Sequence, residues 1–226
     1  PTRVYVLKTL RFARNNAGVS NGFDLDGRVS NATDTGGCRK VDLTAPDGTP
    51  GVDNQFASLL PAIEATGGIA FEGLIQNAIN AGNILLLVEV SGLDDHRDDS
   101  CVSVSVVDGQ GAPLLDAAGG MEAGQTFARS ETPPPPPVTG QVADSTLLAD
   151  GLALTVPAYV FFYEFRVPIQ SARLSMTLAD DGTASGVVAG AVLVETLIEI
   201  VSQIDGADGV PDAVIALAPG LADLFP

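Results

Sequence analysis

A chain of 226 residues that is 46% hydrophobic, with a mean hydropathy of +0.28, is long and apolar enough to fold around a substantial core. Its 28 acidic and 11 basic residues give a formal net charge of −17, which repels phosphate backbones and anionic lipid surfaces. We therefore expect no nucleic-acid partner, and the lack of a long apolar run predicts no membrane span.

The first quarter of the chain predicts a strand, a long loop and a helix. Residues 2–10 alternate in part between apolar and polar side chains and are rich in strand formers. The stretch down to Gly51 is dominated by Gly, Asn, Asp, Thr and Pro, which indicates a long functional loop or one organised by a metal. Asp53 is then placed to cap a helix that Gly67 and Gly68 end.

The middle of the chain predicts a second helix and a hairpin. Residues 71–81 repeat the helical apolar pattern. Residues 84–90 form an apolar run typical of a strand buried on both faces, whereas residues 101–107 alternate with Ser and predict one solvent-facing side. An Asp-rich turn at residues 94–99 joins them. The five prolines at 133–137 favour polyproline II, as an interdomain spacer or as a strap across the surface.

The last third predicts further strands at residues 152–156, 160–167, 172–178 and 184–188, and a helix over residues 191–204. Seven or more short strands with few helices indicate a mainly β fold. We expect a β-sandwich or jelly-roll-like core with three or four short helices inserted at its edge. We expect one β-rich domain over residues 1–226, with possible sub-lobes 1–132 and 138–226 joined by the proline strap 133–137.

The two cysteines, Cys38 and Cys101, lie 63 positions apart and outside any CxxC pair, so neither a zinc motif nor a thioredoxin-type motif is encoded. We interpret them as a structural disulfide, with two buried free thiols as the alternative. A disulfide requires an oxidising compartment, and the chain begins at Pro1 without Met. We therefore expect an extracellular or cell-surface protein from which a signal peptide has been removed.

Acidic, glycine-rich loops are the most informative chemical feature of the chain. Calcium takes about six to eight oxygen ligands, and irregular Asp, Asn and Gly loops supply carboxylate and carbonyl oxygens. We expect calcium as the cofactor. The candidate ligands are Asp24, Asp26, Asp47, Asp53 and Asn54 in the first loop, with Asp42 nearby, and Asp208 and Asp212 near the C-terminus.

Two resemblances accompany these loops. Residues 208–212, Asp-Gly-Val-Pro-Asp, resemble the ending of thrombospondin type 3 and related bacterial calcium repeats, which implies calcium coordination. Only one copy is present, and Ile204 and Gly206 stand where that pattern normally carries Asp. Residues 22–27 and 46–55 are similar to loops of uncharacterised exported bacterial proteins, a likeness that implies no known activity. The alternative interpretation is that these aspartates form turns and helix caps on an acidic surface.

Catalytic patterns are weak. Residues 18–22 match G-x-S-x-G, but no helix follows them, and the chain's one histidine, His96, lies in a hydrophilic turn. Glu89 and Glu164 lie in apolar segments and are candidates for the paired carboxylates of a glycosidase, yet the chain has no Trp to stack on a sugar. We therefore do not expect an enzyme.

Two classes of function remain. The first is an exported, calcium-stabilised extracellular structural subunit without catalytic activity, which self-associates into a filament or surface layer through terminal segments or exposed strand edges. The alternative is a monomeric cell-surface adhesion module or a module that binds carbohydrate or another ligand. The N-terminal strand, the proline strap and the apolar residues 221–226 favour assembly into a homopolymer.

Overall fold

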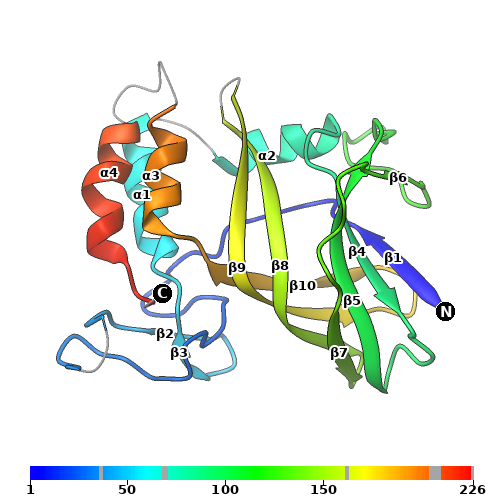
Figure 1. The fold of residues 1–226 in the computed structure, drawn as a ribbon, viewed down its shortest axis with the longest axis horizontal. Helices are drawn as coiled ribbons and strands as arrows, with labels where there is room; N and C mark the ends of the chain where they lie inside the picture. Colours follow the sequence, from blue (N-terminus) through cyan, green and yellow to red (C-terminus); the bar gives the residue numbers. More distant parts are fainter. Residues whose placement is uncertain (36–37, 68–70, 161–162, 204–209, 225–226) are drawn as a thin grey trace. The chain divides into compact units, whose positions relative to one another are not determined.

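The computed structural model in Figure 1 describes residues 1–35, 38–67, 71–160, 163–203 and 210–224. Contacts between residues divide the chain into two compact units. Unit 1 comprises Pro1–Leu10, Gly73–Tyr159 and Pro168–Gly190, and unit 2 comprises Arg11–Glu72, Val160–Val167 and Ala191–Pro226. The proline strap lies inside unit 1, so the two units interleave along the chain. The expected single domain and its division at the strap stay predictions.

One curled antiparallel sheet makes up most of unit 1. Its strands are β1 (Thr2–Val6), β4 (Leu86–Ser91), β5 (Asp99–Gln110), β6 (Ala128–Arg129), β7 (Val138–Ala143), β8 (Thr146–Val160), β9 (Tyr163–Leu178) and β10 (Ala184–Ala191). They follow the order β1-β4-β5-β7-β8-β9-β10, and β6 pairs with β5 outside this path. The predicted mainly β fold with few helices is confirmed.

The remaining elements are helices and a small second sheet. The helices are α1 (Phe56–Gly67), α2 (Phe71–Asn80), α3 (Val194–Val201) and α4 (Val210–Leu221), and the small sheet pairs β2 (Leu43–Thr44) with β3 (Pro50–Val52). Helix α4 packs against α1 and α3 in unit 2. Among the described residues, no helix is long and apolar enough to cross a membrane.

The hairpin of β4 and β5 shows why the apolar run of β4 folds as a strand. Strand β4 has antiparallel partners on both sides, β1 and β5, so its backbone is fully used in the sheet. Leu86, Leu87 and Val90 are buried, as the continuous apolar pattern predicts. Strand β5 alternates between buried Val and more exposed Ser, and the prediction of one wet face is confirmed.

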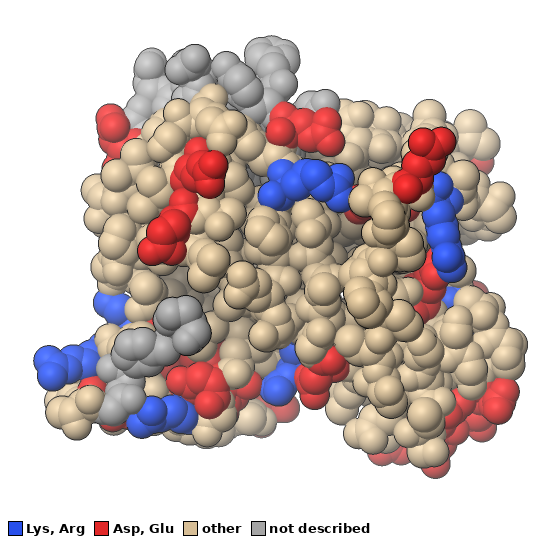
Figure 2. Space-filling model, in the orientation of Figure 1, with Lys and Arg blue, Asp and Glu red and all other residues tan. Residues whose placement is uncertain are grey.

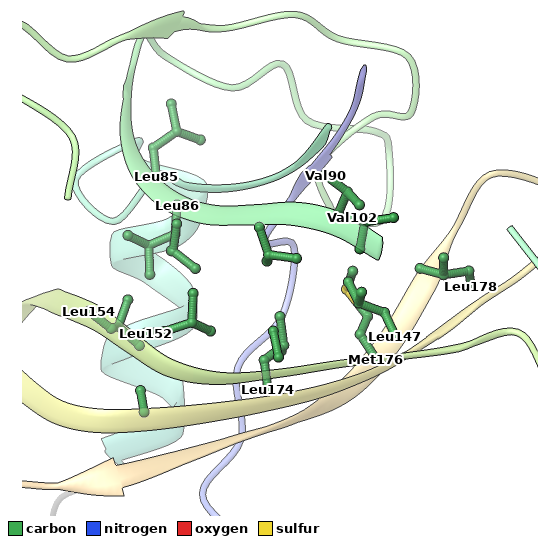
Figure 3. Packing of buried hydrophobic residues seen from close by; sticks show 14 of the residues in the cluster. Leu85, Leu86, Val90, Val102, Leu147, Leu152, Leu154, Leu174, Met176 and Leu178 are labelled. Carbon is green, nitrogen blue, oxygen red and sulfur yellow. The ribbon is translucent and has the colours of Figure 1, made fainter. Parts of the chain in front are cut away.

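The core of unit 1 lies inside the curl of the sheet. Figure 3 shows Val90 and Val102, from β4 and β5, facing Leu147 and Met176, from β8 and β9. Helix α2 adds Ile79, which is fully buried. Because one sheet curls around its own side chains, it supplies both walls of the core.

A single buried acid interrupts this apolar pattern. Glu89 in β4 is only 7% exposed. Arg129 of β6 forms a bidentate ion pair with Glu89. Its Nε donates to Glu89 Oε1 at 2.6 Å, and its Nη2 donates to Oε2. A bidentate pair of this kind offsets the cost of burying the carboxylate. Glu89, one of the two candidate glycosidase carboxylates, is thus held in a bidentate ion pair with Arg129.

The charged side chains visible in Figure 2 are dispersed over a largely uncharged surface. On that face the Lys and Arg side chains lie singly or in small groups, mostly beside Asp or Glu.

We predict that Arg129→Met lowers the free energy of unfolding by about 2–3 kcal/mol, because it leaves a buried carboxylate without its partner. Arg173→Met is the matched control, since Arg173 pairs with the exposed Asp150 and such pairs contribute about 1 kcal/mol or less. Urea unfolding of both variants measures the difference. Equal small losses would contradict the structural role of the Glu89 pair.

Candidate metal centre

Five aspartates of unit 2 form two overlapping groups, which we call the aspartate cluster. Carboxylate oxygens of Asp24, Asp26 and Asp53 lie within 4.8 Å of one another, and so do those of Asp42, Asp53 and Asp223. Asp53 belongs to both groups and is therefore the centre of the cluster. The members come from the acidic loop, from the segment before α1 and from the segment after α4.

Backbone hydrogen bonds hold the acidic loop around Asp53. The Asp53 N–H donates to the Phe23 carbonyl at 3.0 Å, and the Leu25 N–H donates back to Asp53 Oδ2 at 2.6 Å. Asp24 Oδ1 in turn accepts from the Gly27 N–H at 2.6 Å, which closes a tight turn. These bonds bring Asp24 and Asp26 to Asp53 although about 30 residues separate them along the chain.

Glycine at position 51 permits this close approach. Gly51 in β3 has a φ of +93°, a backbone conformation that side chains with a Cβ disfavour. A Cβ atom there would lie 3.1 Å from the Arg28 carbonyl oxygen and 3.3 Å from the Asp24 carboxylate. Any other residue would therefore push β3 away from the loop that carries Asp24.

The second group contains two buried oxygens that lack a hydrogen-bond partner. The Ser30 N–H donates to Asp42 Oδ2, whereas Asp42 Oδ1 is buried without a partner. Gln55 hydrogen-bonds the Asp223 carboxylate, yet Asp223 Oδ2 is also buried without a partner. Lys40 anchors the same C-terminal segment by donating to the Gly220 carbonyl. Buried acceptors of this kind cost free energy until a donor or a cation satisfies them.

Burial also changes the pKa values of the cluster. Burial raises the pKa of Asp53 to about 7, against the Leu25 hydrogen bond, and the neighbouring acids Asp26, Asp223 and Asp42 raise it further. Burial is also the main cause of the raised pKa of Asp42 and of Asp223. Each carboxylate is thus less stable in its charged form than it would be in water.

These observations fit a hard divalent cation. The cluster offers only carboxylate oxygens, which are the ligands that calcium prefers over nitrogen or sulfur. A cation there would satisfy Asp42 Oδ1 and Asp223 Oδ2 and would favour the ionised form of Asp53. Asp24, Asp26, Asp42, Asp53 and Asp223 are the residues that would hold it.

The structure brings together three of the residues predicted as ligands, Asp24, Asp26 and Asp53, and places Asp47, Asn54 and Asp212 outside these two groups. Asp47 lies in the turn between β2 and β3, where the Thr49 N–H donates to it at 2.9 Å and lowers the pKa of Asp47. Asp212 is exposed in the first turn of α4. Asp208 lies outside the described residues.

Asn54, also predicted as a ligand, starts α1 instead. Its Oδ1 accepts from the Ala57 N–H at 3.2 Å, and its Nδ2 donates to Ser20 Oγ at 2.8 Å. The prediction that Asp53 caps this helix was therefore wrong. The Asp53 carboxylate accepts from the Leu25 N–H, and Asn54 caps the helix instead.

The sequence does not single out Asp223, and it offers Asp42 only as one acid near the first loop. The signal for Asp223 is its place among the apolar residues 221–224, where a lone acid requires a partner. The sequence does not show which residues surround Asp223, because they come together only when α4 packs on α1 and brings the C-terminal segment to the acidic loop.

The structure records both cysteines as free thiols, Cys38 half-buried in unit 2 and Cys101 exposed in unit 1. Burial, followed by the charges of Asp223 and Asp26, raises the pKa of the Cys38 thiol, which places it near the aspartate cluster. The predicted disulfide stays a prediction. His96 contacts Asp180 at 2.7 Å in unit 1 and belongs to neither carboxylate group.

Comparisons of the chain with protein-family models, with curated proteins and with solved structures find no match. The likeness to thrombospondin type 3 repeats and to exported bacterial proteins therefore stays a prediction. Function has to be inferred from the residues themselves.

We predict that the metal-stripped protein loses stability as the pH rises from 5 to 8. The pKa of Asp53 is about 7 when folded and 3.8 ordinarily, so its stabilising proton is fully present below pH 4 and is lost as the pH rises through 7. Because Asp53 is half-buried, solvent screens part of the effect, and we expect a loss of about 1–2 kcal/mol.

Asp53→Asn is the control for this prediction, because an amide keeps the acceptor for the Leu25 N–H and does not titrate. Urea unfolding in the presence of a chelator at several pH values measures both proteins. The variant should depend less on pH than the wild type, and an identical slope would show that Asp53 is not the titrating group.

Proposed function

We propose that this protein is an exported, calcium-stabilised extracellular structural subunit without catalytic activity. Calcium bound by the aspartate cluster supplies the stability, and self-association supplies the structural role. The observation that carries the proposal is the pair of buried carboxylate oxygens, on Asp42 and Asp223, that have no partner in the described chain.

The position of the cluster supports a structural role for the cation. Asp223 follows α4, Asp42 precedes the β2–β3 hairpin and Asp53 precedes α1, so one cation would join three segments that are distant in the sequence. Helix α4 packs on both α1 and α3. A cation that holds the end of α4 would therefore stabilise the helical part of unit 2 as a whole.

The chemistry of the site also supports calcium rather than a catalytic metal. Its side chains are aspartates held by backbone donors, without the imidazole or thiolate ligands that zinc and other catalytic transition metals favour. Extracellular modules commonly bind calcium with a Kd of about 10⁻⁴–10⁻³ M. A site of such modest affinity would be filled outside the cell, and this supports an extracellular location.

Calcium should raise the melting temperature of the stripped protein. With free calcium at about 100 times its Kd, the native state gains about 2.7 kcal/mol, which is about 5–10 °C for a chain of this size. Magnesium at the same concentration should give a smaller shift, because it demands octahedral geometry and sheds water reluctantly. Scanning calorimetry at pH 7.5 measures both shifts.

Two asparagine variants locate the effect. Asp223→Asn removes one charged ligand from the cluster and should lose most of the calcium-dependent shift, while Asp47→Asn alters an acid of the β2–β3 turn, outside the cluster, and should keep the full shift. If the two variants respond alike, or if calcium does not stabilise the wild type, the proposed site is wrong.

A further inference from the structure

The sheet of unit 1 ends in two strands that each have one neighbour. In the described chain β1 pairs only with β4, and β10 stands at the other end of the strand order beside β9. An edge strand presents N–H and C=O groups that can pair with another chain. The sheet therefore offers two open edges of different character.

The register of β1 shows which of its groups point outward. Gly92 N–H donates to the Pro1 carbonyl and Leu7 N–H donates to the Leu86 carbonyl, so residues 1 and 7 are hydrogen-bonded to β4. Because bonded and non-bonded positions alternate in an antiparallel pair, the N–H and C=O groups of Thr2, Val4 and Val6 face the open edge. Val4 is also 50% exposed, which leaves an apolar side chain there.

Strand β10 lacks the features that usually protect an edge. Its sequence, Ala-Ser-Gly-Val-Val-Ala-Gly-Ala, contains no charged residue and no proline over eight residues. Natural edge strands are commonly guarded by charges, prolines or short length. Val188 in its middle is 44% exposed. At eight residues, β10 is long enough to accept all five residues of β1.

Charge selects between the possible pairings of these edges. Residues 1–23 hold Arg3, Lys8, Arg11 and Arg14 and none of the 28 acidic residues, so this segment is basic in a chain of net charge −17. Strand β10 is uncharged, and the acidic pair Asp180 and Asp181 precedes it. Pairing β1 with a second β1 would place two basic segments side by side, and they would repel each other. Pairing β10 with a second β10 would bring together two strands without a basic residue, so neither would attract the acidic residues of the other copy.

We infer that β1 of one copy adds to the β10 edge of the next copy, which joins the sheets of successive molecules. The contact is heterologous, so it leaves a free β1 and a free β10 at the two ends and propagates as a filament instead of closing as a dimer. This inference rests on the proposed structural role and does not depend on the aspartate cluster.

Two variants with complementary defects test this pairing. Val4→Pro removes an outward N–H of β1 while leaving the bonds of residues 3 and 5 to β4, and Val188→Lys places a charge on the β10 edge. Val4→Thr, which keeps the N–H, and Leu148→Lys, at a residue 41% exposed on the interior strand β8, are the matched controls. Circular dichroism melting checks that all four variants fold.

Sedimentation velocity over a range of concentrations gives the result. Wild type and both controls should form a growing series of oligomers, whereas Val4→Pro and Val188→Lys alone should each stay monomeric. An equimolar mixture of these two should form dimers and nothing larger, since only one productive pair of edges remains. Assembly of Val4→Pro alone to wild-type size, or a wild type that stays monomeric at high concentration, would overturn the inference.

The calcium-dependent melting shift of monomeric Val188→Lys separates this inference from the calcium site. A full shift in this variant, together with a wild type that never assembles, would retain the calcium site and remove the edge pairing. Loss of the shift in an assembling wild type would do the reverse.

Discussion

The burial of carboxylates around Asp53 is the constraint on which unit 2 depends. Backbone donors at Leu25 and Ser30 hold Asp53 and Asp42 in place, and Lys40 and Gln55 bring the segment of Asp223 to them. The donors to Asp53 and Asp42 are neutral backbone groups. The pKa of about 7 for Asp53 means that its proton leaves near neutral pH, and a bound cation would then favour the ionised carboxylate.

The two units differ in whether a buried carboxylate has a partner. In unit 1, Glu89 is buried against Arg129, so the chain carries its own counter-charge. In unit 2, Asp42 and Asp223 each keep a buried oxygen without a partner. A chain that pairs its buried acid in one unit and leaves two such oxygens in the other is consistent with an external cation at the second place. This contrast is the physical basis for the calcium proposal.

Periodicity predicted much of the fold, because the relevant patterns are local. The apolar run of β4 and the alternation of β5 both follow from neighbouring residues. The lengths of β8 and β9 did not, since Pro157 and Pro168 interrupt strand patterns that the sheet nevertheless continues. Helix α4 was not predicted, because residues 208–212 resemble a calcium-repeat ending, although proline is well tolerated in the first turn of a helix. Of the site, Asp24, Asp26 and Asp53 could be predicted from their loop, whereas the role of Asp223 depends on tertiary packing.

A crystal structure from crystals grown in calcium at neutral pH tests calcium binding by the aspartate cluster directly, and anomalous scattering identifies the ion. We predict a calcium peak about 2.3–2.6 Å from carboxylate oxygens of Asp53, with Asp42 and Asp223 among its ligands. An aspartate cluster without such a peak, or calcium bound only at Asp47 and other turn residues, would contradict it.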